Sequence, residues 1–191
     1  MKLRAGTLFL AVLVMRSVTM AAVSVSVSMP VPAEVQAVLF KNIWKLDRNF
    51  DCTRGVKLAI VYQEKYDDSV AAKDEFLASI DRLGPHTTVV LVEAGTQELL
   101  SNGLHGNSLD MVYVTPLRAV DVSEIGRISR YERFRTITGV PEYVEEAGLA
   151  VGIGVRKDRP LIIINLEQAR AEGAVFSSQL LSLARIVGPV Q

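Results

Sequence analysis

The chain has 191 residues, of which 49% are hydrophobic and 22% are charged, a composition typical of one packed globular domain and unlike that of a disordered protein. Its 21 basic and 21 acidic side chains give a formal net charge of zero. Because contacts with phosphates need a net basic surface, this balance argues against a general nucleic-acid-binding protein.

The N-terminal end has the residue order of a secretory signal. Lys2 and Arg4 precede an almost entirely apolar run over residues 5–15, and small residues follow, so that signal peptidase would cut after Ala21 or Ala22. A membrane span needs about 20 uninterrupted apolar residues, and this run is shorter. We therefore expect export of the chain, with an uncleaved membrane anchor as the rival interpretation.

Three segments are predicted along the chain: a signal peptide over residues 1–21, a leader over residues 22–32 and a single α/β domain over residues 33–191. Removing the signal peptide leaves 18 basic and 21 acidic side chains, a net charge of −3. The leader alternates apolar and small residues and is expected to be a loose segment or an edge strand. Cys52 is the only cysteine, so it is either a buried free thiol, the commoner case, or pairs between chains.

Helices are predicted where apolar residues recur at helical spacing. The first covers residues 33–46, begins just after Pro32 and is expected to dock on another element, with Phe40 and Trp44 beside its apolar stripe. Further helices are expected from Asp67 to a stop at Gly84 and Pro85, around 97–100, over 122–130, from Pro141, from Asn165 to Gly173, and from Ser177 with an apolar stripe that runs to Val187.

Strands are predicted where short runs of apolar and β-branched residues occur. These runs cover residues 56–62, 87–94, 110–116, 134–139, 149–155 and 160–166. Only four residues join the last two, so this pair must form an antiparallel hairpin, because a parallel crossover needs a dozen residues or more. The sequence therefore predicts an α/β three-layer sandwich, with a mainly parallel sheet and an antiparallel C-terminal hairpin at its edge.

Two stretches of the C-terminal part have a more specific pattern. In residues 163–187, IINLEQARAEGAVFSSQLLSLARIV, a strand ends in Ile-Asn-Leu, a short Ala/Arg-rich helix follows, and Ser-Ser-x-Leu-Leu-x-Leu-Ala closes the domain. Upstream, residues 136–153 read TITGVPEYVEEAGLAVGI, a strand, a Pro-containing turn and a Gly-led hairpin. Both stretches resemble the YfiR family of bacterial periplasmic proteins; before about residue 110 the similarity is weak.

The resemblance implies a periplasmic regulatory protein rather than an enzyme. In the characterised branch of the family, such a protein binds and restrains the periplasmic part of an inner-membrane diguanylate cyclase, so that cyclic-di-GMP output and biofilm formation follow envelope conditions. A homodimer is also expected from the resemblance alone. Two departures matter: that branch uses several cysteines in redox-linked disulfides, whereas this chain has Cys52 alone, and residues 45–54 lack an expected Trp-Pro ending. Redox control through an internal disulfide therefore does not carry over.

Two surfaces are candidates for the contact with this partner. One is the N-terminal helix with Phe40 and Trp44, and the other is the arginine-rich segment with Arg127 and Arg130. A solvated helix face is the alternative interpretation of the arginines.

A second class of function is a small periplasmic ligand-binding module that serves a transporter or a sensor kinase. Open α/β sheets bind ligands beside the carboxyl ends of their parallel strands. Tyr62, Glu93 and Thr115 stand at these ends and are the candidate ligand residues, although their position as strand ends is explanation enough.

The residues show no catalytic or metal-binding motif. His86 and His105 lie in predicted loops without the ligand spacing of a zinc site, and the GxSxG nucleophile motif is absent. Gly152 and Gly154 lack the third glycine and the strand-to-helix context of a dinucleotide-binding loop. We therefore expect no enzymatic activity, no cofactor and no metal.

Overall fold

A computed structural model describes residues 29–51, 53–84 and 86–188. Within them a seven-stranded sheet has the order β2-β1-β3-β4-β5-β6-β7. The strands are β1 (Val56–Tyr62), β2 (Thr87–Glu93), β3 (Met111–Val114), β4 (Arg135–Thr138), β5 (Val151–Arg156), β6 (Arg159–Asn165) and β7 (Arg185–Val187). The helices are α1 (Ala33–Trp44), α2 (Asp67–Ala78), the 3-10 helix η1 (Ile80–Arg82), α3 (Gln97–Leu104), α4 (Ser123–Glu132), α5 (Pro141–Glu145), α6 (Leu166–Ala171) and α7 (Ser178–Leu183).

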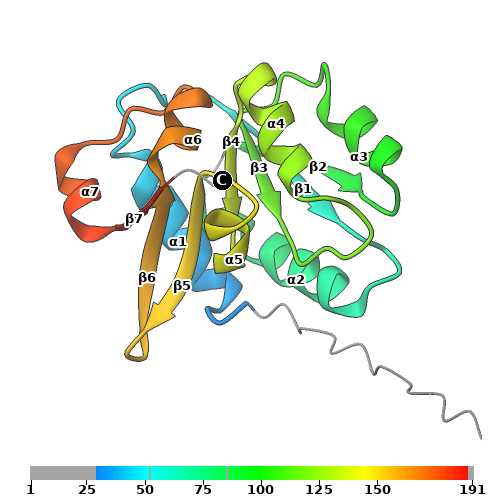
Figure 1. Cartoon of the computed structure of the whole chain (residues 1–191), viewed down its shortest axis with the longest axis horizontal. Helices are drawn as coiled ribbons and strands as arrows, with labels where there is room; N and C mark the ends of the chain where they lie inside the picture. The colour runs from blue at the N-terminus through cyan, green and yellow to red at the C-terminus, as the bar shows by residue number, and fades with distance from the viewer. Residues whose placement is uncertain (1–28, 52, 85, 189–191) are drawn as a thin grey trace, which may run out of the picture.

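The sheet is the middle layer of three (Figure 1). Strands β2, β1, β3, β4 and β5 run parallel to one another, and β6 is antiparallel to β5. Helices α1, α2 and α7 pack on one face, and α3, α4 and α5 pack on the other. The predicted three-layer α/β sandwich with its C-terminal antiparallel hairpin is thereby confirmed.

Each face of the sheet has its own hydrophobic core, because successive side chains of a strand point to opposite faces. In β1, Leu58 and Ile60 enter the core under α1, whereas Ala59 and Val61 enter the core under α3 and α4, and all four are fully buried. Burial on both faces explains why the central strands are apolar throughout, as parallel strands covered by helices require.

The hairpin turn is tighter than the predicted four-residue connection. Arg156 pairs with Arg159, so only Lys157 and Asp158 form the loop. Both have positive φ, 50° and 58°, which is the geometry of a type I′ turn and matches the twist of the two strands.

The last helix is shorter than predicted. α7 ends at Leu183, Ala184 takes an extended conformation with ψ 152°, and β7 pairs in parallel with β6. The prediction of a helix as far as Val187 was therefore wrong: the β-branched residues Ile186 and Val187 gain strand pairing at the sheet edge, and that outweighs an apolar spacing that also fits a helix. Similarly, α2 ends at Ala78, and η1 precedes the predicted stop.

The predicted signal peptide and residues 22–28 of the leader lie outside the described residues. Residues 29–32 form no strand. Val31 is buried, and its carbonyl accepts a hydrogen bond of 2.7 Å from Gln36 Nε2, which fixes the approach to α1. In the part of the chain that the structure describes, no helix has both the length and the apolar character needed to span a bilayer.

Candidate functional site

The first predicted contact surface, on α1, faces inward. Phe40 is fully buried and Trp44 is only 2% exposed. The Phe40 ring packs edge-on against the Phe76 ring of α2, with 6.3 Å between their centroids. The exposed apolar residues of α1 are instead Val35 and Val38. The two rings therefore belong to the core between α1 and the sheet and do not form an exposed surface that a protein partner could cover.

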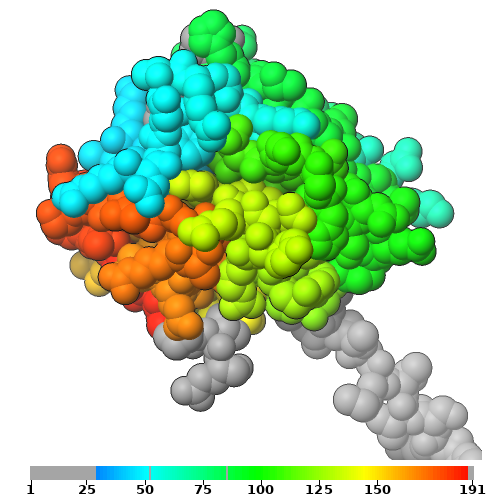
Figure 2. Space-filling view, turned by 90° about the horizontal axis from the view of Figure 1, so that it is seen from above, coloured from blue at the N-terminus to red at the C-terminus, as the bar shows by residue number. Residues whose placement is uncertain are grey.

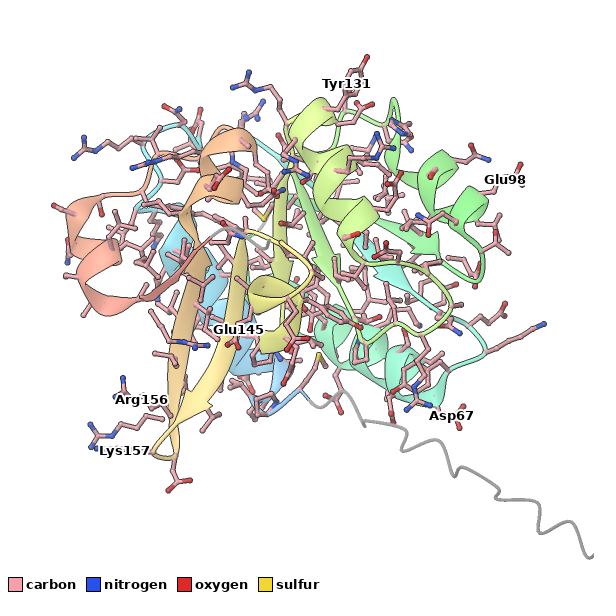
Figure 3. All side chains as sticks on the ribbon, viewed as in Figure 1. Asp67, Glu98, Tyr131, Glu145, Arg156 and Lys157 are labelled. Atoms are coloured by element: carbon pink, nitrogen blue, oxygen red, sulfur yellow. The ribbon has the colours of Figure 1, made fainter. Side chains whose placement is uncertain are left out.

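The second predicted contact surface, on α4, does face solvent. Ile125 and Ile128 are fully buried against the sheet, whereas Arg127, Arg130 and Tyr131 point outward. The Tyr131 side chain is 80% exposed and stands away from the domain at the end of α4 (Figure 3). The helix thus presents an aromatic ring and two guanidinium groups on one face, the residue types that dominate the energetics of protein interfaces.

The two arginines of α4 differ in their electrostatic surroundings. Arg127 Nε donates to Glu124 Oε2 at 2.7 Å, and this hydrogen bond lowers the pKa of Glu124 and raises the pKa of Arg127. No salt bridge between described residues involves Arg130. The exposed Arg130 guanidinium is therefore not paired with a carboxylate among those residues, although Glu146 and Glu167 line the same cavity.

A cavity of about 320 Å³ lies beside Arg130, between α4, the turn after α5 and the start of α6. Figure 2 shows α4 and α6 as neighbours on the surface of this end of the molecule. The helix approaches the turn closely because residue 126 is a glycine: a Cβ atom there would be 3.0 Å from the carbonyl oxygen of Gly148. The cavity is lined by Ser123, Gly126, Arg130, Glu146, Ala147, Gly148, Asn165, Glu167, Gln168 and Ala171.

A buried carboxyl group beneath this cavity ties α4, β4 and α6 together. Glu172 is fully buried. Its Oε1 is 2.8 Å from Ser129 Oγ of α4 and accepts from Gln168 Nε2 of α6 at 2.9 Å. Thr136 of β4 donates to Oε1 through Oγ1 at 2.7 Å and to Oε2 through its backbone N–H at 2.9 Å. These hydrogen bonds therefore fix the position of α4, which carries the exposed face, relative to β4 and α6.

Burial raises the pKa of Glu172 to about 7, because removal from water penalises the charged carboxylate. The hydrogen bonds from Gln168, Thr136 and Ser129 oppose this effect, since they stabilise the charged form. As a result, the Glu172 carboxyl group changes its charge near neutral pH.

The three predicted ligand residues at the carboxyl ends of the strands do not form one open site. Thr115 is fully buried, and its hydroxyl donates to the Val61 carbonyl at 2.9 Å and lies 2.6 Å from Ser69 Oγ. The Tyr62 ring lies under the Lys73 ammonium, 5.3 Å from its centroid. Glu93 does line a cavity, of about 260 Å³, together with residues 63–65, 95, 96 and 99.

The chain reverses its winding direction between β1 and β3, where open sheets bind their ligands, and here this position is bridged by hydrogen bonds. Gln63 Oε1 accepts from the backbone N–H groups of Arg118 and Ala119 at 2.9 and 3.0 Å. The Arg118 guanidinium stacks over the Tyr66 ring at 4.1 Å. The loop after β3 thus packs across the strand ends and leaves the cavity near Glu93 to one side.

Two residues of the site were not found from the sequence. The sequence did contain a signal for Tyr131, because it lies four residues after Arg127 and therefore on the same side of the helix as that arginine. Glu172 had none: its partners Ser129 and Thr136 are far away along the chain, and only the fold brings them together.

Across the described residues, no group of three or more His, Cys, Asp or Glu side chains is arranged to hold a metal ion. His105 lies 2.8 Å from a carboxylate oxygen of Glu132 through Nδ1, and His86 is exposed just before β2.

Several solved structures share the fold at low sequence identity. An ABC domain in complex with L-Trp from Streptococcus pneumonia has a TM-score of 0.60 at 14% identity, covering 82% of this chain and 62% of that one. A ligand-free, open substrate-binding protein with adhesive properties from Clostridium difficile has a TM-score of 0.58 at 14% identity, with coverages of 83% and 60%. A conserved domain protein from Vibrio cholerae has a TM-score of 0.61 at 14% identity, with coverages of 82% and 60%. The chain spans about three fifths of the length of these structures, and the likeness shows the fold alone.

Sequence comparison identifies the family directly. No curated protein matches the chain. Residues 53–185, which include strands β1 to β6 and the whole surface formed by α4 and α6, match the family described as YfiR/HmsC-like. The resemblance expected from the C-terminal motifs is confirmed over most of the domain, and the chain belongs to the YfiR/HmsC-like family.

Proposed function

We propose that this protein is exported to the periplasm and regulates signalling there by binding and restraining an inner-membrane partner, a diguanylate cyclase of the cyclic-di-GMP pathway. The observation that carries the proposal is the YfiR/HmsC-like match over residues 53–185. Cyclic-di-GMP output, and with it biofilm formation, would then depend on whether the periplasmic part of the cyclase is bound. The protein acts as a regulator rather than a catalyst.

The contact surface in this proposal is the outer face of α4, defined by Arg127, Arg130 and Tyr131. Tyrosine and arginine contribute most to binding when a partner excludes water around them. The α4 surface supplies both, on a helix held by the Glu172 hydrogen bonds. A regulator restrains its partner only if it binds the inactive conformation more tightly than the active one, so this surface must fit the inactive cyclase better.

The test of the proposal is a crosslinked pull-down from the native envelope, with a C-terminal tag on the full chain. We expect to recover one inner-membrane protein that carries a cytoplasmic cyclase domain, and we expect deletion of the regulator to raise cyclic-di-GMP. Recovery of the protein alone, processed and without a membrane partner, would contradict the proposal. Recovery of a second copy of the chain would in addition support the homodimer expected from the family.

Substitutions in the α4 surface should weaken binding of the partner without changing the stability of the fold. We expect the double substitution Arg130→Ala/Tyr131→Ala to weaken capture of the partner by about tenfold to a hundredfold, because arginine and tyrosine are enriched among the few interface residues whose truncation costs more than about 1 kcal/mol. The thermal midpoint should stay near that of the wild type, since both side chains are exposed.

The matched control for this prediction is Arg156→Ala/Lys157→Ala at the tip of the β5–β6 hairpin, far from α4 in Figure 3. It also removes two exposed long side chains. Dissociation constants for the purified periplasmic part of the partner would be compared for both variants. Equal binding by the α4 variant and the wild type would remove this helix from the interface.

A small periplasmic ligand-binding module is the second candidate function. The cavity of about 260 Å³ beside Glu93 favours it, as does the fold shared with a substrate-binding protein and with a domain that holds L-Trp. This function predicts a rise in the thermal midpoint with an amino acid, sugar or anion, and loss of that rise in Glu93→Gln. A screen without any shift would count against it.

A further inference from the structure

A second cavity lies at the opposite ends of the strands from Glu93. Its volume is about 130 Å³, and it opens where β1, β2 and β3 begin, beside the last turn of α1. The first residues of these three strands, Val56, Thr87 and Met111, contribute to its wall. The adjoining residues 45–51 and 53–56 are at the surface in the view of Figure 2. This cavity is separate from both sites considered above.

The inner wall of this cavity is apolar and aromatic. Trp44 and Phe50 line it, with ring centroids 5.7 Å apart, and Leu83 and Met111 complete it. The volume corresponds to roughly four water molecules, enough for one ring or a short chain. A wall of this kind favours the apolar body of a small molecule over bulk water.

The rim of the cavity is cationic. Lys41 and Lys45 lie on the same side of α1 as Trp44, and Arg54 and His86 stand at the starts of β1 and β2. Arg54 is neutralised by Asp110, at 2.5 Å. Neither lysine takes part in a salt bridge between described residues, and no acidic side chain is among the described residues that line the cavity.

One residue that lines the cavity carries a hydrogen-bond donor without a partner among the described residues. Trp44 lines the cavity, and its Nε1 is buried and makes no hydrogen bond within the described part of the chain. An indole N–H can only donate, and burying it unpaired is costly. The donor lies on the same helical turn as two lysines that have no acidic partner in the described structure. A negatively charged acceptor would satisfy both the donor and the lysines.

We propose that this cavity binds a small organic anion, with an apolar body against Trp44 and Phe50 and a carboxylate held by Trp44 Nε1, Lys41 and Lys45. The three groups come from one turn of α1, so their spacing is set before the ligand arrives. The inference does not depend on the signalling function or on the cavity near Glu93.

Trp44 is the only tryptophan, so its fluorescence reports on the site directly. The full chain would be titrated with benzoate, with neutral benzyl alcohol and with cationic benzylamine, exciting at the red edge of the indole band to limit the signal of the tyrosines. We expect a saturable change with benzoate, binding of benzyl alcohol weakened about tenfold or more, and no saturation with benzylamine. Unsaturable changes, or equal binding of benzoate and benzyl alcohol, would overturn the proposal.

Variants locate the binding. Lys41→Gln/Lys45→Gln should weaken benzoate binding about tenfold or more, whereas the matched control Arg156→Gln/Lys157→Gln at the hairpin tip should bind as the wild type does. Trp44→Phe, which removes the donor and keeps an aromatic ring, should abolish the rise in thermal midpoint that benzoate gives to the wild type. Wild-type affinity in the double lysine variant would also overturn the assignment.

Discussion

Replacing Asp47 with alanine is expected to cost about 3–5 kcal/mol of unfolding free energy, the loss typical when one member of a buried ion pair is removed. The Asp47 side chain is fully buried and the Arg135 side chain is 13% exposed, with 3.3 Å between Oδ2 and Nη2. Oδ1 also accepts from the backbone N–H groups of Asn49 and Val175, at 2.9 and 2.8 Å. The substitution leaves these two backbone donors without their acceptor and the largely buried guanidinium without its carboxylate, with only the carbonyl oxygens of Asn49 and Gly173 as remaining acceptors.

Asp51→Ala is the matched control for this prediction. Asp51 is an exposed aspartate four residues further on, and its carboxylate bonds to Thr53. Its loss should change the unfolding free energy by about 0.5 kcal/mol or less. Urea unfolding followed by circular dichroism would measure both variants. If Asp47→Ala and Asp51→Ala gave the same midpoint, the carboxylate would not be what holds the end of α1 against β4 and the segment after α6.

Glu172 should make the protein less stable as the pH rises toward neutrality. Its pKa is about 7 in the folded protein against an ordinary value of 4.5. Below pH 4.5 the carboxyl group is protonated in both states. Between these values the unfolded chain releases the proton first, so the unfolding free energy falls with increasing pH, by roughly 3 kcal/mol in total. Above pH 7 this contribution stays lost.

The Glu172→Gln variant isolates this effect, because glutamine has the shape of the protonated acid and does not titrate. Unfolding free energies would be measured from urea melts at pH 4, 5, 6, 7 and 8, and the value for the wild type would be subtracted from the value for the variant at each pH. We expect the variant to gain stability relative to the wild type as the pH rises through this range. Glu98→Gln, at an exposed position on α3 (Figure 3), should show no such trend. A pH-independent difference for Glu172→Gln would contradict the raised pKa.

The two predictions concern two sets of contacts that hold α6 and the segment after it against β4. Asp47 and Arg135 fix the segment after α6 against the start of β4, and Glu172 fixes the end of α6 against β4 and α4. Both sets of contacts therefore fix the elements β4 and α6, against which α4 and the proposed contact surface pack. A variant at either position that weakens partner capture must be compared with the α4 surface variant before the loss is assigned to contact rather than to folding.

The strands and the fold class were predictable because the signals are local. A strand buried on both faces must be apolar, as β1 is, and a short connection between two strands must give a hairpin. The ends of helices and strands were less predictable where the same residues fit both a helix and a strand. Ile186 and Val187 continue an apolar helical stripe and also make a good strand, and only the free edge of β6 decides between them.

The layered α/β fold, the family and the solvent-facing arginines of α4 were predictable from the sequence, because these depend on periodicity and on a motif of neighbouring residues. Which apolar side chains are available to a partner depends on the tertiary structure: Phe40 and Trp44 are of residue types common in contact surfaces, but they are buried between α1 and the sheet. The tertiary structure alone also placed Glu172 beside Ser129 and Thr136. The physical reason is the same in both cases, since burial and hydrogen bonding depend on segments that are distant along the chain and adjacent only after folding.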